Sequence, residues 1–285
     1  IMMAAGSGEI LKTGGLMASW DKGSIVCADP TYHDLIRYAG RAGSEIIRVP
    51  VNENMASDLD ALASAIRSDT VMVYLVNPNN PTPTTFKHDE LREFVLEVSK
   101  KRMVFIDEAY YEYVEDPTYG TMIDLVAAGH RNIIVARTAS KIHGLAGLRV
   151  GFGFAHPDHI QRLTALKTGQ YNILGVEAAY ASYQDDSFQD FTRRKNRESM
   201  DIVEEMFEEL GVRYIKSPTN FTFFETGIPV ETLNAELREH GIMSGRPFPP
   251  FTTWSRISMA KPEDMRYYVQ TFKQLFAHRI RDLAA

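Results

Sequence analysis

Cysteine and long apolar runs are what this sequence lacks most clearly. Cys27 is the single cysteine in 285 residues, so no disulfide can form within the chain and a reducing compartment is favoured. No apolar run reaches the roughly 20 residues that a membrane-spanning helix requires. The first residues show no signal-peptide pattern. We therefore expect a cytoplasmic protein that has no membrane partner.

An excess of basic residues and metal-ligand patterns are also missing. Lys and Arg number 31 against 37 Asp and Glu, and the resulting net charge of −6 gives no support to nucleic-acid binding. The 8 histidines show no spacing typical of a metal site, so we propose no metal. Hydrophobic residues make up 44% of the chain, which is enough to bury the core of one large domain or two modest ones.

Several apolar runs predict the buried strands of a parallel sheet. The clearest cover residues 71–76, 103–106 and 132–136. They are nearly continuous in apolar residues, as strands covered on both faces are. Polar residues follow them, and the candidates are Asn80, Asp107 and Lys141. Because ligands of open parallel sheets bind beyond the carboxyl ends of the strands, this convergence predicts one site.

The residue with the clearest chemistry is Lys141, which lies just past the last of these strands. A partly desolvated lysine in such a small-residue loop can lose its proton and attack a carbonyl, the requirement for Schiff-base chemistry. Arg149, together with the hydroxyls of Thr138 and Ser140, could hold a phosphate beside it. Taken alone, the same residues could form a turn with a solvated Lys/Arg pair.

Three further candidates also have an ordinary structural interpretation. Gly6-Ser7-Gly8 precedes a predicted helix with Ser7 as N-cap, where free N–H groups suit a phosphate, although a serine there is usually only a cap. Tyr32, after a short predicted strand, could stack on a ring or simply pack on its neighbours. Asp107 could stand opposite a cationic ring nitrogen or cap a helix.

Together, these motifs resemble those of fold-type I aminotransferases of class I and II, which depend on pyridoxal 5'-phosphate (PLP). G-S-G, P-T-Y, N-N-P-T, D-E-A-Y, S-K…R and R-I-S occur in the family's order, and the run S-K-I-H-G-L-A-G-L-R is most similar to that of histidinol-phosphate aminotransferases. The resemblance covers essentially the whole chain. It implies PLP as cofactor, bound by Gly6, Ser7, Gly8, Tyr32, Asn80, Asp107, Tyr110, Thr138, Ser140, Lys141 and Arg149.

The resemblance also implies roles for individual residues. The expected catalytic residues are Lys141, which carries the cofactor, Asp107, which pairs with the pyridine nitrogen, and Tyr110, which bonds to the ring oxygen. Arg256, in a strand-like run, matches the arginine that clamps a substrate carboxylate through its planar guanidinium. Arg246 matches a second arginine, near the substrate's distal phosphate.

The implied reaction moves an amino group between an amino acid, or an amino-acid-derived amine similar to histidinol phosphate, and a 2-oxo acid. Pro83 stands where the family has glycine, so we expect the loop after Asn80 to follow a different path. Two alternatives stay open because fold does not fix chemistry. One is a PLP lyase or decarboxylase of the same fold. The other is a non-enzymatic PLP-binding regulator, which the acidic charge argues against.

The expected architecture is α/β, with a mainly parallel sheet flanked by helices over residues 1–175 and a smaller α+β domain over residues 176–285. The family pattern implies a homodimer. Ile1–Ala5 reads as the tail of a strand, and family members carry several tens of residues before this point. We therefore expect that an N-terminal part of the large domain precedes Ile1.

Overall fold

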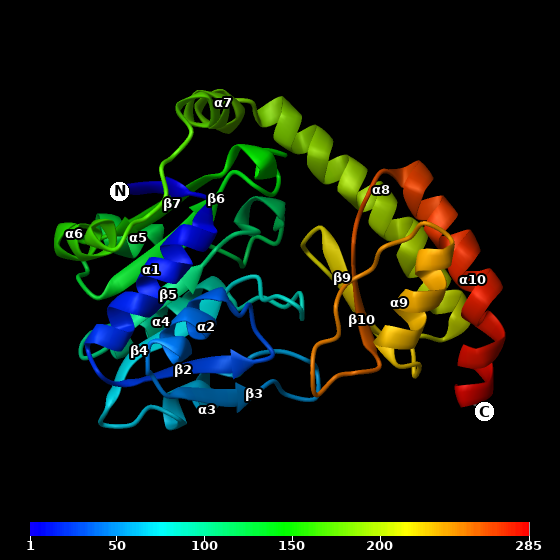
Figure 1. Cartoon of the computed structure of the whole chain (residues 1–285), viewed down its shortest axis with the longest axis horizontal. Helices are drawn as coiled ribbons and strands as arrows, with labels where there is room; N and C mark the ends of the chain where they lie inside the picture. The colour runs from blue at the N-terminus through cyan, green and yellow to red at the C-terminus, as the bar shows by residue number, and fades with distance from the viewer. Residues whose placement is uncertain (285) are drawn as a thin grey trace. The chain divides into compact units, whose positions relative to one another are not determined.

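The computed structural model describes the backbone of residues 1–284 and the side chains of residues 1–280 (Figure 1). It divides the chain into two compact units. Unit 1 comprises residues 1–80 and 84–189, and unit 2 comprises residues 81–83 and 190–285. Each unit has its own sheet and its own hydrophobic core. Within the described residues, no helix is both long enough and apolar enough to cross a membrane.

Unit 1 is built on a seven-stranded, mainly parallel sheet with the strand order β1-β7-β6-β5-β4-β2-β3. The strands β3, β2, β4, β5 and β6 are parallel neighbours, whereas β7 is antiparallel to both β6 and β1. This arrangement confirms the predicted α/β fold. The bounds are β1 Met2–Ala5, β2 Ser24–Asp29, β3 Ile46–Pro50, β4 Thr70–Val76, β5 Met103–Asp107, β6 Ile133–Thr138 and β7 Val150–Ala155.

Helices cover both faces of this sheet, which explains why its central strands are apolar almost throughout. One hydrophobic core includes Ile10 of α1 and Phe105 of β5, and a second includes Leu91 of α4 and Val104 of β5. Neighbouring residues of one strand thus belong to opposite cores, as a pleated strand requires. The helices are α1 Ser7–Trp20, α2 Asp34–Arg41, α3 Leu59–Ser64, α4 His88–Ser99, α5 Ile123–Ala127 and α6 Pro157–Ala165.

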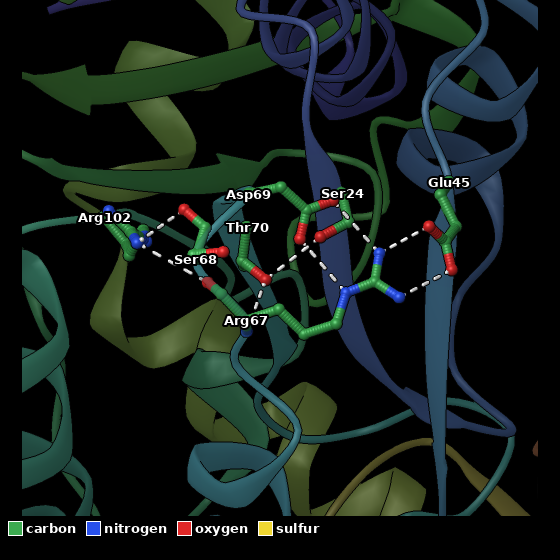
Figure 2. Close-up of polar contacts among 7 residues, drawn as sticks. All are labelled: Ser24, Glu45, Arg67, Ser68, Asp69, Thr70 and Arg102. Carbon is green, nitrogen blue, oxygen red and sulfur yellow. Dashed lines mark hydrogen bonds and ion pairs between the residues drawn. The ribbon is translucent and has the colours of Figure 1, made fainter.

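Polar contacts tie the amino-terminal ends of several strands together, as Figure 2 shows. The Arg67 guanidinium pairs with Glu45, just before β3, and with Asp69, just before β4, where Nε lies 3.0 Å from the carboxylate. The hydroxyls of Ser24 and Thr70, the first residues of β2 and β4, lie 3.0 Å apart. This end of the sheet is therefore closed by side chains that bond to one another.

Helix α7 (Ile173–Tyr183) remains part of unit 1, because its Ala179 is buried against Ala139 and Val150. The next helix, α8 (Asp186–Leu210), begins in unit 1 and continues in unit 2. The change of unit therefore falls between residues 189 and 190, later than the boundary at 175/176 expected from the sequence. The loss of strand-like pattern after β7 does not reveal that α7 packs back onto the first sheet.

Unit 2 combines a three-stranded antiparallel sheet with helices, in agreement with the predicted α+β class. The strand order is β10-β9-β8, and the bounds are β8 Tyr214–Ile215, β9 Phe221–Glu225 and β10 Trp254–Ser258. Helices α8, α9 (Val230–Glu239) and α10 (Pro262–Ala284) share its core. That core includes Phe207 of α8, Phe224 of β9, Leu233 of α9 and Phe272 of α10.

Gly14 of α1 provides a test of how tightly the first core is packed. A Cβ at this position would lie 2.6 Å from Cε2 of the fully buried Phe105 ring, closer than real contacts allow. Gly14→Ala should therefore lower the free energy of unfolding by about 1–3 kcal/mol, even though alanine is the better helix former by ~1 kcal/mol. Denaturant unfolding measures this change.

The matched control is Gly40→Ala in α2, where the new Cβ would meet Cγ1 of Ile46 at an ordinary 3.7 Å. This variant should be as stable as the wild type or slightly more stable. Equal stability of the two variants would contradict the tight packing of α1 against β5.

Candidate active site

A cavity of about 250 Å³ lies at the carboxyl ends of the parallel strands. Asn80 follows β4, Asp107 is the last residue of β5, and Lys141 follows β6, so three neighbouring strands each contribute one side chain. The structure thus brings together residues that are 61 positions apart along the chain (Asn80 to Lys141). The lining residues are Ser7, Gly8, Tyr32, Asp34, Val76, Asn80, Asp107, Ala109, Tyr110, Thr138, Ser140, Lys141, Ala146 and Arg149.

Lys141 is held in a short folded loop between β6 and β7. The backbone N–H of Leu145 donates to the carbonyl of Ala139, and Gly144 supplies the left-handed turn with a φ of 68°. The lysine is half-buried, and its Nζ lies 4.9 Å from the centroid of the Tyr110 ring. That ring is 3% exposed, so the amine faces a packed aromatic surface inside the cavity.

Asp107 is a buried carboxyl in the same cavity, with only 2% of its surface exposed. Its Oδ1 accepts a 3.2 Å hydrogen bond from the backbone N–H of Ala109. Burial raises the pKa of Asp107 to about 7, and the positive charge of Lys141 and the bond from Ala109 oppose that rise. Asp107 therefore does bond to the following turn, as a capping aspartate would, yet it also faces the cavity.

The opposite part of the lining gathers groups that attract anions. Arg149 donates from Nη1 to the carbonyl of Ala146 at 2.9 Å, and the same nitrogen lies 3.5 Å from the Ser140 hydroxyl. Ser140 in turn accepts a 2.9 Å bond from the Thr138 hydroxyl. Beside them begins α1, whose first N–H groups carry a partial positive charge. Two hydroxyls, a guanidinium and a helix start therefore lie along one cavity wall.

Gly6, not Ser7, is the N-cap of α1, which corrects the capping role expected for the serine. Ser7 is the first helical residue and lines the cavity together with Gly8. Gly6 has a φ of 82°, and a Cβ there would lie 2.3 Å from Nη2 of Arg149. Only glycine lets the backbone pass this closely to the guanidinium, so the turn and the arginine form one cradle.

Tyr32 and Asn80 line the cavity from the loops after β2 and β4. These loops are joined directly, because the Thr31 hydroxyl donates to Oδ1 of Asn79 at 2.8 Å. The Tyr32 hydroxyl donates to Oδ2 of Asp34 at 2.9 Å. Asp34 was not among the expected site residues. An aspartate in the first turn of a helix is so ordinary that nothing in the sequence singles it out.

The two arginines expected to bind substrate belong to unit 2. Arg256 lies in β10, and its guanidinium carbon is 4.2 Å from the centroid of the Phe221 ring. The guanidinium carbon of Arg246 is 4.4 Å from the centroid of the Phe248 ring. Both guanidinium groups therefore lie against aromatic faces, an arrangement that attracts a cation to the ring.

The family model of aminotransferase class I and II matches residues 1–272. The chain belongs to this family. A histidinol-phosphate aminotransferase of Moorella thermoacetica is 32% identical over 280 residues, which are 97% of this aminotransferase chain and 72% of the relative.

Solved structures agree with this assignment. A structure from Erwinia carotovora atroseptica, at 32% identity, has a TM-score of 0.92 and covers 98% of this chain and 82% of its own. A histidinol-phosphate aminotransferase from Sinorhizobium meliloti, solved with pyridoxal-5'-phosphate, shares the fold at 23% identity. Its TM-score is 0.81, and the match covers 99% of this chain and 77% of that one.

Metal ligands do not gather in the described part of this aminotransferase: no group of three or more His, Cys, Asp and Glu residues there could hold a metal ion.

The raised pKa of Asp107 gives a prediction for the cofactor-free protein. Between about pH 4 and pH 7 the folded state holds a proton that the unfolded chain has lost, so this contribution to stability is present at low pH and disappears as the pH rises through about 7. Asp107→Asn is neutral at every pH. We therefore expect the unfolding temperature of Asp107→Asn, relative to that of the wild type, to be higher at pH 8 than at pH 5 by about 2 °C or more.

Asp89→Asn, which changes a fully exposed carboxylate, serves as the control and should show no such gain. Thermal unfolding followed by circular dichroism at the two pH values measures all three proteins. A stability difference between Asp107→Asn and wild type that stays constant with pH would sink the idea that this carboxyl is destabilised by burial.

Proposed function

We propose that this chain is a PLP-dependent aminotransferase that transfers an amino group between an amino acid, or an amine derived from one, and a 2-oxo acid. One observation carries the proposal: a lysine, a buried carboxyl, an aromatic ring and an anion-attracting wall line the same cavity. Relatives named histidinol-phosphate aminotransferase and the PLP-bound Sinorhizobium meliloti structure support it.

The residues present fit PLP on two structural grounds. Asp107 is a buried carboxyl whose ionised form is disfavoured, and a cationic ring nitrogen beside it would restore that charge. The cradle of Gly6 and Arg149 leaves backbone and guanidinium donors in a space that any side chain at Gly6 would fill. A phosphate suits that space, because charge-assisted bonds from a guanidinium and a helix start both favour an anion.

Each end of the cofactor would thus have its own set of residues. The phosphate set is Gly6, Ser7, Gly8, Thr138, Ser140 and Arg149, and the ring set is Tyr32, Asn80, Asp107 and Tyr110. PLP supplies an electron sink for the charge that develops on the substrate's α-carbon when its proton leaves. The buried Asp107 carboxylate would keep the ring nitrogen protonated, and this would make the sink effective.

Lys141 is the group that moves protons. Its half-buried Nζ lies beside the Tyr110 ring, which limits access of water to the amine. With PLP and substrate bound, the Lys141 amine would take the proton from the substrate's α-carbon as general base and, once protonated, would act as general acid. Tyr110 would remain next to this amine, since its ring centroid lies 4.9 Å from Nζ.

Arg256 is the proposed clamp for the substrate carboxylate, and Arg246 is the proposed contact for a distal phosphate such as that of histidinol phosphate. The bidentate fork of arginine suits both anions. Pro83, three residues after Asn80, stands where the resembled family has glycine. Assays with several amines as donors identify the one that this chain uses. Arg256→Lys should raise the KM for the amino acid about tenfold or more while PLP affinity stays unchanged.

The proposed location is the cytoplasm, which the buried, unpaired Cys27 suits because a reducing compartment keeps such a thiol free. Cell fractionation with an antibody against this chain checks the location.

Lys141→Ala tests the function directly. We expect the wild type to convert a 2-oxo acid into its amino acid with histidinol phosphate or an amino acid as donor, and the variant to be slower by about a thousandfold or more. Borohydride treatment with PLP should attach the cofactor to the wild-type peptide that contains Lys141, as read by mass spectrometry. Lys87→Ala, at an exposed lysine, is the control. Carbon dioxide release without amino-acid formation would point to a decarboxylase instead.

The proposed assembly is a homodimer, the commonest symmetric form. Helix α7 supports it, because Ile173, Leu174 and Tyr180 of this one helix are 64%, 77% and 67% exposed. Sedimentation should give twice the chain mass, and Leu174→Glu should shift the protein toward the monomer because a carboxylate cannot be buried there without a partner. A wild-type monomer with full activity would contradict the assembly.

A further inference from the structure

Asp34 is an ionisable residue of the cavity wall to which the proposed reaction gives no role. It is the first residue of α2, and 19% of its side chain is exposed. Its position in the first turn of a helix accounts for an aspartate in the sequence. It does not account for a carboxylate that lines the cavity beside Tyr32 and Asp107.

The Asp34 carboxylate bonds on both sides. Oδ2 accepts the hydroxyl of Tyr32 at 2.9 Å, and Oδ1 accepts Nη2 of Arg37, one turn later on α2, at 2.8 Å. Nε2 of His33 lies 3.7 Å from Oδ1. The tip of the Tyr32 ring is therefore bonded to the first residue of α2.

The Tyr32 phenol is a lasting donor to this carboxylate. Burial raises the pKa of Tyr32 above its usual value, and the charge of Asp34 and the hydrogen bond to it raise it further. The hydroxyl therefore keeps its proton over the working pH range. A hydrogen bond to a charged acceptor is stronger and more directional than a neutral one.

The backbone next to Tyr32 is anchored as well. Thr31 donates its hydroxyl to Asn79, and Nδ2 of Asn79 donates to the carbonyl of Pro30 at 3.0 Å. The segment before the ring is thus tied to the loop after β4, while the far tip of the ring is tied to α2. Both ends of the tyrosine are thus held, and the axis of its ring has a fixed position beside the cavity.

The carboxylate also lies beside the start of α1. A Cβ on Gly8 would be 3.8 Å from Oδ2 of Asp34. This is an ordinary contact distance, so the Asp34 carboxylate and the first turn of α1 are neighbours. Burial is the main cause of the raised pKa of Asp107, and the charge of Asp34 adds to it, so the two carboxylates act on one cavity.

We propose that Asp34 is a positioning residue for Tyr32. By accepting the phenol bond it fixes the tyrosine ring as the surface on which the ring of PLP lies. A phenol that donates to a carboxylate is also richer in electrons, and its face attracts a cationic ring more strongly. This positioning role rests on the proposed function in one respect, the identity of the ligand as PLP.

A double-mutant cycle tests the proposal through PLP binding, with wild type, Tyr32→Phe, Asp34→Ala and the double variant. The dissociation constant of PLP, measured by absorbance titration, should rise about tenfold in each single variant. The double variant should be no weaker than the singles, because both remove the same bond. A double variant weaker by the product of the two single effects would overturn the proposal.

Two further variants separate the phenol bond from a merely structural effect. Asp34→Asn keeps an oxygen that can accept the bond, so it should lose less affinity than Asp34→Ala. Arg37→Gln leaves the phenol bond in place and should bind PLP within about twofold of wild type. The visible circular dichroism of bound PLP should fall in Tyr32→Phe and Asp34→Ala and stay normal in Arg37→Gln. A loss in Arg37→Gln equal to that in Asp34→Ala would show that Asp34 does not act through Tyr32.

The same cycle in the cofactor-free protein distinguishes this proposal from the proposed function. Thermal unfolding should show non-additive effects of Tyr32→Phe and Asp34→Ala, since their bond exists without PLP. A wild type that binds no PLP would refute the proposed function, even with this coupling intact. Additive effects on unfolding would refute the positioning role, even in a protein that binds PLP well.

Discussion

The candidate site depends on keeping the Asp107 carboxyl buried at the end of a strand. A buried carboxyl without a full partner is costly, because its charge is separated from water. The strands on either side of β5 hold the backbone of Asp107 by ladder pairing, so the side chain cannot move toward solvent. The nearby cation of Lys141 offsets part of the cost, and a cationic ligand would offset more. The sheet thus holds in the cavity a carboxyl group whose charge is only partly balanced by Lys141.

The parallel sheet determines which residues can take part in that chemistry. The residues after β4, β5 and β6 come together at its carboxyl ends, and each strand supplies a different group. The anion-attracting groups come from other elements, the start of α1 and the loop before β7. The carboxyl and the amine thus come from strand ends, whereas the anion-attracting groups come from a helix start and a loop.

Much of the fold and site could be predicted from the sequence, because the decisive signals are local. Continuous apolar runs predict buried parallel strands, and the residues that end them fall at one edge by topology. What could not be predicted depends on contacts between distant segments. Packing of Ala179 against β7 keeps α7 in unit 1, and the non-helical backbone of Gly6, with a φ of 82°, makes this residue the cap. Asp34 could not be predicted as a site residue, because its bond to Tyr32 depends on the direction in which α2 leaves the loop.

The polar network at the amino-terminal ends of the strands (Figure 2) has a consequence for how dissolved ions act on this protein. Arg67, Glu45 and Asp69 expose 46%, 60% and 50% of their side chains, so their attraction is weakened by mobile counterions. Asp107, at the carboxyl end of β5, is 2% exposed, so mobile ions screen its charge much less. Rising ionic strength therefore weakens the attractions at the amino-terminal ends of the strands more than it weakens the field around Asp107.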